Sequence, residues 1–215
     1  MVPAVDCRAR GEVALSESHW RLFVSISVPD AIKHEIERLQ FEMRRIVAPD
    51  CVRWTGDQLH LTLRFLGNVA TNKVEDLTFA LRQATKACSS FGLRARRVGF
   101  FPPKRFPRVI WIGIESEHDE LLKLQFETAR ASEPFTDERE DRTFSGHLTL
   151  GRVKRIGRAE AEQLWTFAEK LGDRCFGDWK VESVELMRSE LDQAGARHTR
   201  LAQFPLHGCG TDRSG

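Results

Sequence analysis

The four residues His60-Leu61-Thr62-Leu63 occur a second time in the chain as His147-Leu148-Thr149-Leu150. Each copy lies in an apolar run typical of a β-strand, the first over residues 59–66 and the second over residues 144–153. Side chains alternate between the faces of a strand, so the His and Thr of each copy share one face and the leucines share the other. The sequence therefore predicts two strands, each with a polar face for chemistry and an apolar face for the core.

Two such strands side by side would gather two imidazoles and two hydroxyls around one point. An imidazole titrates near neutral pH, so one ring can act as a base and the other as an acid on an anionic group such as a phosphate. The other interpretation is that each histidine is structural and each threonine an ordinary strand former. Arg64 and Arg152 follow the motifs closely and are either solvated or bind the phosphate.

The composition is that of an ordinary soluble globular protein. The chain has 215 residues, 41% hydrophobic and 30% charged, with a formal net charge of +2, which gives no general signal for polyanion binding. Five scattered cysteines form no C-x-x-C pair, so neither a disulfide framework nor a zinc site is predicted. No P-loop and no H-x-x-x-H cluster is present, so we expect no metal and no cofactor. No run of residues is apolar enough to span a membrane, and the first nineteen residues lack the apolar core of a secretory signal. The unpaired cysteines favour reduced thiols in a cytoplasmic protein, and a monomer is expected because no long exposed apolar stripe is evident.

Alternating strand and helix patterns predict an α+β fold. Residues 1–19 are expected to be a poorly ordered leader, 20–207 one bilobal domain and 208–215 a tail. Strands are predicted over 21–28, 52–54, 59–66, 91–101, 108–115, 144–153, 180–191 and 196–206, and helices over 30–46, from 68 to about 84, and over 117–131 and 158–171. The two motifs stand 147 − 60 = 87 residues apart, which favours an internal duplication with a pseudo-twofold relation between two lobes.

A basic run interleaved with aromatic residues could follow an RNA backbone and stack bases, or could be the wet face of an alternating strand. The basic members are Arg94, Arg96, Arg97, Lys104, Arg105 and Arg108, and the aromatic members are Phe100, Phe101 and Phe106.

The paired H-x-T-x motifs resemble those of the 2H phosphoesterases. The wider text resembles the RNA 2′,3′-cyclic phosphodiesterase branch, also called 2′-5′ RNA ligase-like proteins. The stretches that carry this resemblance are RLFVSISVP (21–29), VRWTGDQLHLTLRFLGNV (52–69), F-P-x-x-x-x-P-R-V-I-W-I-G (101–113), FSGHLTLGRV (144–153) and GARHTRLAQFPL (195–206).

The resemblance implies a bilobal α+β fold in which two antiparallel sheets line a central cleft with the helices outside. It also implies that His60 is the general acid for the 3′ oxygen and that His147 is the base that activates water. Thr62 and Thr149 would bind the phosphate with help from Arg152. Two positions depart from the family: Gly146 stands where Pro is common before the second motif, and His198 stands where Tyr is common.

Metal-independent hydrolysis of RNA 2′,3′-cyclic phosphate ends to 2′-phosphate ends is the function that these observations predict. The candidate substrates are tRNA fragments and small cyclic nucleotides. The alternatives are the reverse reaction, 2′-5′ RNA ligation, and an RNA-binding module without turnover. Pure binding needs no paired acid and base, so the intact histidines and threonines argue against the module.

Overall fold

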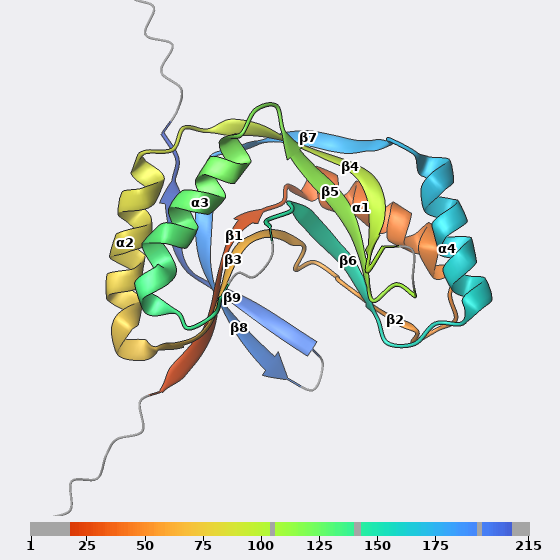
Figure 1. Cartoon of the computed structure of the whole chain (residues 1–215), viewed down its shortest axis with the longest axis horizontal. Coiled ribbons are helices and arrows are strands. Elements are labelled where there is room, and N and C mark those ends of the chain that lie inside the picture. The colour runs from red at the N-terminus through yellow and green to blue at the C-terminus, as the bar shows by residue number, and fades with distance from the viewer. Residues whose placement is uncertain (1–17, 104–105, 140–142, 193–194, 208–215) are drawn as a thin grey trace, which may run out of the picture.

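The computed structural model describes residues 18–103, 106–139, 143–192 and 195–207. In this part of the chain, strands and helices alternate as the sequence predicts, and Figure 1 shows their arrangement. The elements are β1 (His19–Ser27), α1 (Asp30–Arg44), β2 (Val52–Trp54), β3 (His60–Ala70), α2 (Val74–Lys86), β4 (Phe91–Phe101), β5 (Val109–Ser116), α3 (Glu120–Ser132), β6 (His147–Val153), α4 (Arg158–Leu171), β7 (Cys175–Val181), β8 (Ser183–Asp192) and β9 (Gly195–Pro205), with 3-10 turns at Thr71–Lys73 and Glu133–Phe135.

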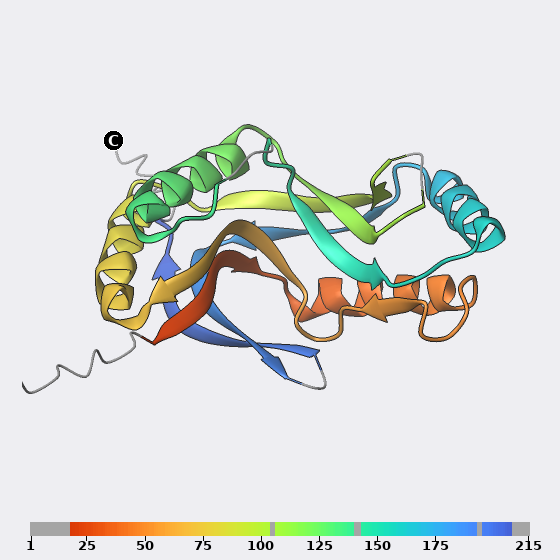
Figure 2. The ribbon, with the colours of Figure 1, turned by 60° about the horizontal axis from the view of Figure 1, so that its bottom comes forward.

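All strands of the described chain join one antiparallel sheet. The order is β7-β4-β5-β6-β3-β1-β8-β9, with β2 paired to β6. The two sheets expected from the sequence are the two halves of this one sheet, β7-β4-β5-β6 and β3-β1-β8-β9. They meet where β3 pairs with β6 through a single residue pair, Leu61 and Leu148. Figure 2 shows how strongly the strands curve, and the predicted α+β fold is confirmed.

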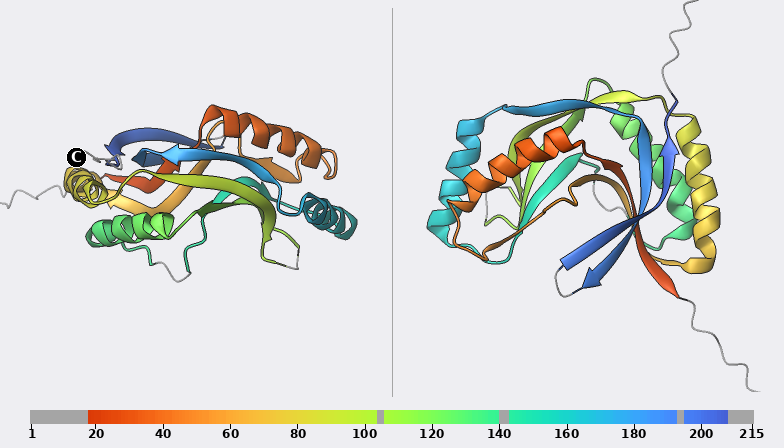
Figure 3. Two further views of the ribbon diagram at one scale, coloured as in Figure 1. Left: turned by 90° about the horizontal axis from the view of Figure 1, so that it is seen from above. Right: turned by 180° about the vertical axis from the view of Figure 1, so that it is seen from behind.

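The helices tie the two halves together. Helix α1 follows β1 in the chain but packs against β7 in the other half, while α3 follows β5 and packs against β3. Figure 3 shows α1 and α4 together on one half and α2 and α3 on the other. Because each half lends a helix to the other, neither half has a complete core of its own.

The core lies on the face of the sheet that carries the leucines of the two motifs. Leu61 and Leu148 are both 0% exposed, as the alternation within each motif predicts. Helix α1 buries Ile32, Ile36, Leu39 and Met43 and also a polar residue, Gln40.

Two predicted elements are wrong in extent. The helix expected from residue 68 begins only at Val74, because β3 continues to Ala70. The sequence favours a single strand over 180–191, whereas β7 ends at Val181 and β8 begins at Ser183. Strand β7 is at the edge of the sheet and carries Gly177, and glycine weakens a strand pattern. Gly177 has φ +131°, and a Cβ there would lie 2.2 Å from Ile32 Cδ1. The glycine therefore weakens the strand pattern in the sequence and also allows α1 to pack closely against β7.

The predicted leader over 1–19 and the tail over 208–215 fall almost entirely outside the described residues, except that β1 already begins at His19. Within the described part, none of the helices has the length and apolar character needed to cross a membrane.

Candidate active site

The register around the Leu61–Leu148 pair brings the two motifs together. Cross-strand partners in an antiparallel pair point to the same face, so His60 and Thr62 on β3 lie on the face that also carries His147 and Thr149 on β6. We call this the histidine face. The two histidines are diagonal neighbours there, a relation that places residues about 7–8 Å apart in a regular ladder. This is the juxtaposition that the sequence predicts.

A main-chain carbonyl and two aromatic rings hold the His60 imidazole. Its Nδ1 lies 2.7 Å from the carbonyl oxygen of Gln58, two residues earlier in the chain. Its ring lies 4.8 Å from the ring of Phe23 on β1 and 5.3 Å from that of His198 on β9, edge to face in the second case.

His147 is held in a matching way. Its Nδ1 lies 2.7 Å from the carbonyl oxygen of Ser145, again two residues earlier. Its ring lies 5.4 Å from Phe101 and 6.5 Å from Trp111. Gly113 is its partner on β5 and offers no side chain against which the imidazole would clash.

The two carbonyl contacts decide which nitrogen of each ring can do chemistry. A carbonyl oxygen only accepts, so each neutral imidazole donates its Nδ1–H and keeps a lone pair on Nε2. Both histidines therefore present Nε2 as the group that exchanges a proton. The sequence shows only that the motifs repeat, and the shared tautomer is a feature of the fold.

Burial disfavours the charged form of the His60 imidazole. It lowers the pKa of His60 to about 4, the hydrogen bond to Gln58 opposes this shift, and the charge of His198 adds to it. At neutral pH without substrate His60 is therefore neutral. The predicted role of His60 as an acid thus needs a partner that restores its proton, and a bound phosphate anion is such a partner.

The threonines lie beside the histidines. Thr62 pairs with Ser25 on β1, and Thr149 pairs with Trp111 on β5. Both threonines are partly exposed and belong to the histidine face.

Arg152 reaches the histidine face because β6 contains a bulge. Trp111 pairs with Thr149 and Val109 pairs with Arg152, so β6 has one more residue than β5 over this stretch. Without the bulge, Thr149 and Arg152 would point to opposite faces, since three positions separate them.

The buried side chain of Gln40 fixes this bulge. Its amide Nε2 donates to the carbonyl oxygen of Leu150, the extra residue, and to that of Thr55, both at 2.9 Å. The Thr55 amide donates to the same Leu150 oxygen at 2.8 Å. The helical period identifies Gln40 only as a polar residue beside an apolar stripe, so its role is one that the sequence does not reveal.

Arg64 is not brought to the histidines. A bulge in β3 pairs it with Val24, whose side chain lies in the core, and its side chain is 8% exposed. One guanidinium N–H donates to the Glu138 carbonyl oxygen at 3.3 Å. The even spacing from His60 predicts the same face only for an unbulged strand.

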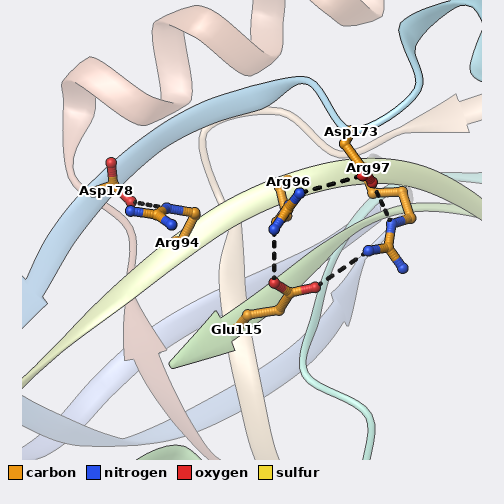
Figure 4. A network of polar contacts seen from close by, with 6 residues as sticks. All are labelled: Arg94, Arg96, Arg97, Glu115, Asp173 and Asp178. Carbon is orange, nitrogen blue, oxygen red and sulfur yellow. Dashed lines mark hydrogen bonds and ion pairs between the residues drawn. The ribbon is translucent and has the colours of Figure 1, made fainter. Parts of the chain in front are cut away.

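Three of the four described basic residues of this run form ion pairs (Figure 4). Arg94 pairs with Asp178 at 2.6 Å, and both Arg96 and Arg97 pair with Glu115 and Asp173 at 3.2–3.6 Å. Arg108 and Phe106 instead line an open groove between the β4–β5 turn and α4. Lys104 and Arg105 lie outside the described residues. Arg94, Arg96 and Arg97 therefore fit the interpretation that this run is the solvated face of a strand.

The two departures from the family pattern have clear places in the fold. Gly146 lies under α3: its oxygen accepts from the Ile114 amide at 2.9 Å, and a Cβ would lie 2.9 Å from Leu121 Cδ2. His198, to which the sequence gives no role, lies against His60. Among the described residues, no group of three or more His, Cys, Asp or Glu side chains could hold a metal ion.

Comparisons with known proteins agree with the motifs. Residues 26–111 match the model of the LigT-like phosphoesterases. The RNA 2′,3′-cyclic phosphodiesterase of Archaeoglobus fulgidus is 30% identical over 194 residues, covering 86% of this chain and 99% of that one. The enzyme of the same name from Methanothermobacter thermautotrophicus is 28% identical, covering 86% of this chain and 98% of that one.

Solved structures share the fold. A crystal structure of a Thermus thermophilus protein superimposes with a TM-score of 0.73 at 27% identity, covering 87% of this chain and 98% of that one. Escherichia coli LigT in complex with 3′-AMP gives a TM-score of 0.69 at 24% identity, covering 88% of this chain and 99% of that one. The chain therefore belongs to the LigT-like phosphoesterases, enzymes of the 2H phosphoesterase superfamily, in the branch of the RNA 2′,3′-cyclic phosphodiesterases.

Proposed function

We propose that the protein hydrolyses RNA ends that carry a 2′,3′-cyclic phosphate and leaves a 2′-phosphate, without a metal ion. The observation that carries the proposal is the matched pair of imidazoles, each with Nδ1 against a main-chain carbonyl and each on the histidine face. The names of the relatives, RNA 2′,3′-cyclic phosphodiesterases, support the choice of substrate.

The proposed reaction assigns one proton transfer to each histidine. Nε2 of His147 takes a proton from water as the water oxygen attacks phosphorus. The bond from phosphorus to the 3′ oxygen breaks, and Nε2–H of His60 gives its proton to that oxygen. The products are a 2′-phosphate and a 3′-hydroxyl, and the proton on His147 returns through solvent to His60.

The phosphate itself prepares His60 for this role. Its negative charge favours the protonated imidazole, which offsets the burial that lowers the His60 pKa to about 4. The hydroxyls of Thr62 and Thr149 and the guanidinium of Arg152 would bind the nonbridging oxygens, where negative charge grows in the transition state. Because these groups stabilise the charge, the scheme needs no metal.

The direct test uses a short RNA that ends in a 2′,3′-cyclic phosphate, incubated with the purified protein in excess EDTA. The product end is identified by chromatography against 2′-phosphate and 3′-phosphate standards. A 2′-phosphate product formed at the same rate with and without EDTA supports the proposal. Tight RNA binding with neither hydrolysis nor ligation would contradict the proposal and indicate an RNA-binding module. Ligation to an RNA with a 5′-hydroxyl end, without hydrolysis, would indicate a ligase.

A further inference from the structure

His198 is a third imidazole beside the pair. It lies on β9 opposite Ser189, and its ring meets that of His60 at 5.3 Å with an interplanar angle of 88°. The same ring meets Phe23 at 4.9 Å and 75°, and Phe23 in turn lies 4.8 Å from His60. The three rings therefore touch one another, and His60 is enclosed by β1 on one side and β9 on another.

His60 and His147 differ in the aromatic rings that surround them. The rings around His147 are those of Phe101 and Trp111, which do not titrate. Of the two motif histidines, His60 is the one with a second imidazole in its ring cluster. The two motif histidines therefore correspond to each other, whereas the rings that surround them do not.

The charged groups around His198 leave it without a carboxylate partner among the described residues. Its Nδ1 is buried and makes no well-aligned hydrogen bond there, although the Arg197 backbone is adjacent. Glu185 pairs with Arg200 at 2.8 Å, and Glu190 pairs with Arg188 at 2.7 Å. The charged side chains that the structure describes on the surrounding strands are Arg21 on β1, Arg64 on β3, Arg152 on β6, Glu185, Arg188 and Glu190 on β8, and Arg197 and Arg200 on β9. The other histidines of these strands are His19 on β1 and His147 on β6.

We propose that His198 is a positioning residue for His60: it confines the His60 ring against Phe23, excludes water from it, and keeps it neutral until an anionic phosphate binds. The inference deepens the proposed function and rests on it for the identity of the substrate. The enclosure fixes the direction of Nε2, which must point at the leaving oxygen for efficient proton transfer.

The electrostatics agree with this geometry. Burial lowers the pKa of His198 as it does that of His60, and two adjacent cations in a buried cluster repel each other. The free protein therefore keeps both rings neutral at physiological pH. In the proposed reaction, the bound phosphate is the group whose negative charge favours protonation of His60.

The test compares variants at this position with a neighbour. His198→Ala removes the ring, His198→Phe keeps a flat ring that cannot titrate, and Thr199→Ala is a control at an exposed site on the same strand. Imidazole ¹⁵N and ¹³C signals report the protonation and the tautomer of His60 in the protein, with and without inorganic phosphate. Steady-state kinetics with the cyclic phosphate RNA give kcat and KM.

In His198→Ala we expect the midpoint of His60 to rise from about 4 by about one pH unit or more and its single tautomer to be lost. We expect kcat to fall about tenfold or more, while KM changes less than about threefold. His198→Phe should keep the low midpoint and most of kcat, and Thr199→Ala should match the wild type. If His198→Ala does not fold, His198→Asn is measured in the same way.

An unchanged midpoint and tautomer of His60 in His198→Ala would overturn the inference, and so would a His198→Phe variant as impaired as the alanine variant. The titration needs no RNA. A protein that hydrolyses no cyclic phosphate would therefore refute the proposed function while the His198 inference is still decided by the titration.

Discussion

At the residue scale, the two histidines are equivalent in sequence and distinct in their surroundings. Both donate Nδ1–H to a carbonyl two residues earlier, so both offer Nε2. His60 is enclosed by Phe23 and His198, whereas His147 lies against Phe101 and Trp111. The motifs therefore supply the reactive groups, and the neighbouring strands make one group different from the other.

Because the pKa of His60 is lowered in the folded protein, the unfolding free energy depends on pH. Its pKa of about 4 in the folded protein lies below the ordinary value of 6.5, so between these values the unfolded chain binds more protons. The contribution of neutral His60 to the unfolding free energy is therefore fully present above pH 6.5. It is lost as the pH falls from 6.5 toward 4, by up to about 1.4 kcal/mol per pH unit.

Urea unfolding at pH 7 and pH 5 checks this dependence. We expect His60→Gln to lose less stability over this interval than the wild type does. Equal losses in the two proteins would contradict the lowered pKa. His34→Gln, at an exposed position on α1, is the control and should behave as the wild type.

Gly99 gives the second prediction at this scale. It faces Trp111 across β4 and β5, and a Cβ there would lie 2.1 Å from the Trp111 ring. Gly99→Ala should displace the indole that lies near His147, lowering kcat by about tenfold and shifting the near-ultraviolet circular dichroism of the tryptophan. Gly92→Ala on the same strand meets nothing within 4 Å and should leave both unchanged. Equal effects at the two positions would show that Trp111 is not what restricts Gly99.

At the element scale, bulges decide which side chains share the histidine face. The β6 bulge brings Arg152 to it, and the β3 bulge turns Arg64 away. Periodicity alone ranks them in the opposite way, because Arg64 stands an even number of residues from His60 and Arg152 an odd number from His147. The extra residue in each strand depends on partners in other parts of the chain, which single-strand patterns do not contain.

Most helices and strands follow from local patterns, and the exceptions have physical reasons. The apolar stripes of α1 and α2 predict their buried faces. The sequence pattern does not predict β7 because Gly177 and two charged residues, Asp178 and Lys180, interrupt its alternation. The identity of His60, Thr62, His147 and Thr149 as one cluster follows from the repeated motif, whereas the addition of His198 depends on the path of β9.

Gln40 tests the importance of the β6 bulge. Gln40→Leu leaves the Leu150 and Thr55 carbonyl oxygens without the donor that Nε2 supplies. We expect a loss of about 1–3 kcal/mol in unfolding free energy, together with a rise in KM as Arg152 loses its place. Gln83→Leu, at an exposed position on α2, serves as the control in the same urea titrations and kinetic assays. A stable variant with normal KM would contradict the role of Gln40.

At the scale of the whole molecule, two half-sheets share a narrow seam. The recorded pairing between β3 and β6 is confined to Leu61 and Leu148, both fully buried. Helices α1 and α3 cross to the opposite half and reinforce this seam. The site is therefore built at the place where the halves meet, and changes in the seam should affect stability and activity together.

Truncation of the seam checks this coupling. Leu61→Ala and Leu148→Ala should each lower the unfolding free energy by about 2–5 kcal/mol, because each leaves a cavity in the core. Leu122→Ala, at a side chain that is 49% exposed, should change it by less than about 0.5 kcal/mol. Calorimetry and denaturant titration measure both. Seam variants as stable as Leu122→Ala would argue against a core at this position.

We propose that His60 and His147 act as a pair in acid–base catalysis on a cyclic phosphate. The most direct measurement is the hydrolysis rate of a cyclic phosphate RNA by His60→Ala, His147→Ala and the double variant, beside His34→Ala and His118→Ala at exposed positions. If they do, each motif variant should lose a factor of about 10²–10⁴ in kcat, and the double variant should be little worse than either single one. The two control variants should hydrolyse the RNA at the normal rate. Normal turnover in either His60→Ala or His147→Ala, in a protein that remains folded, would contradict the proposal.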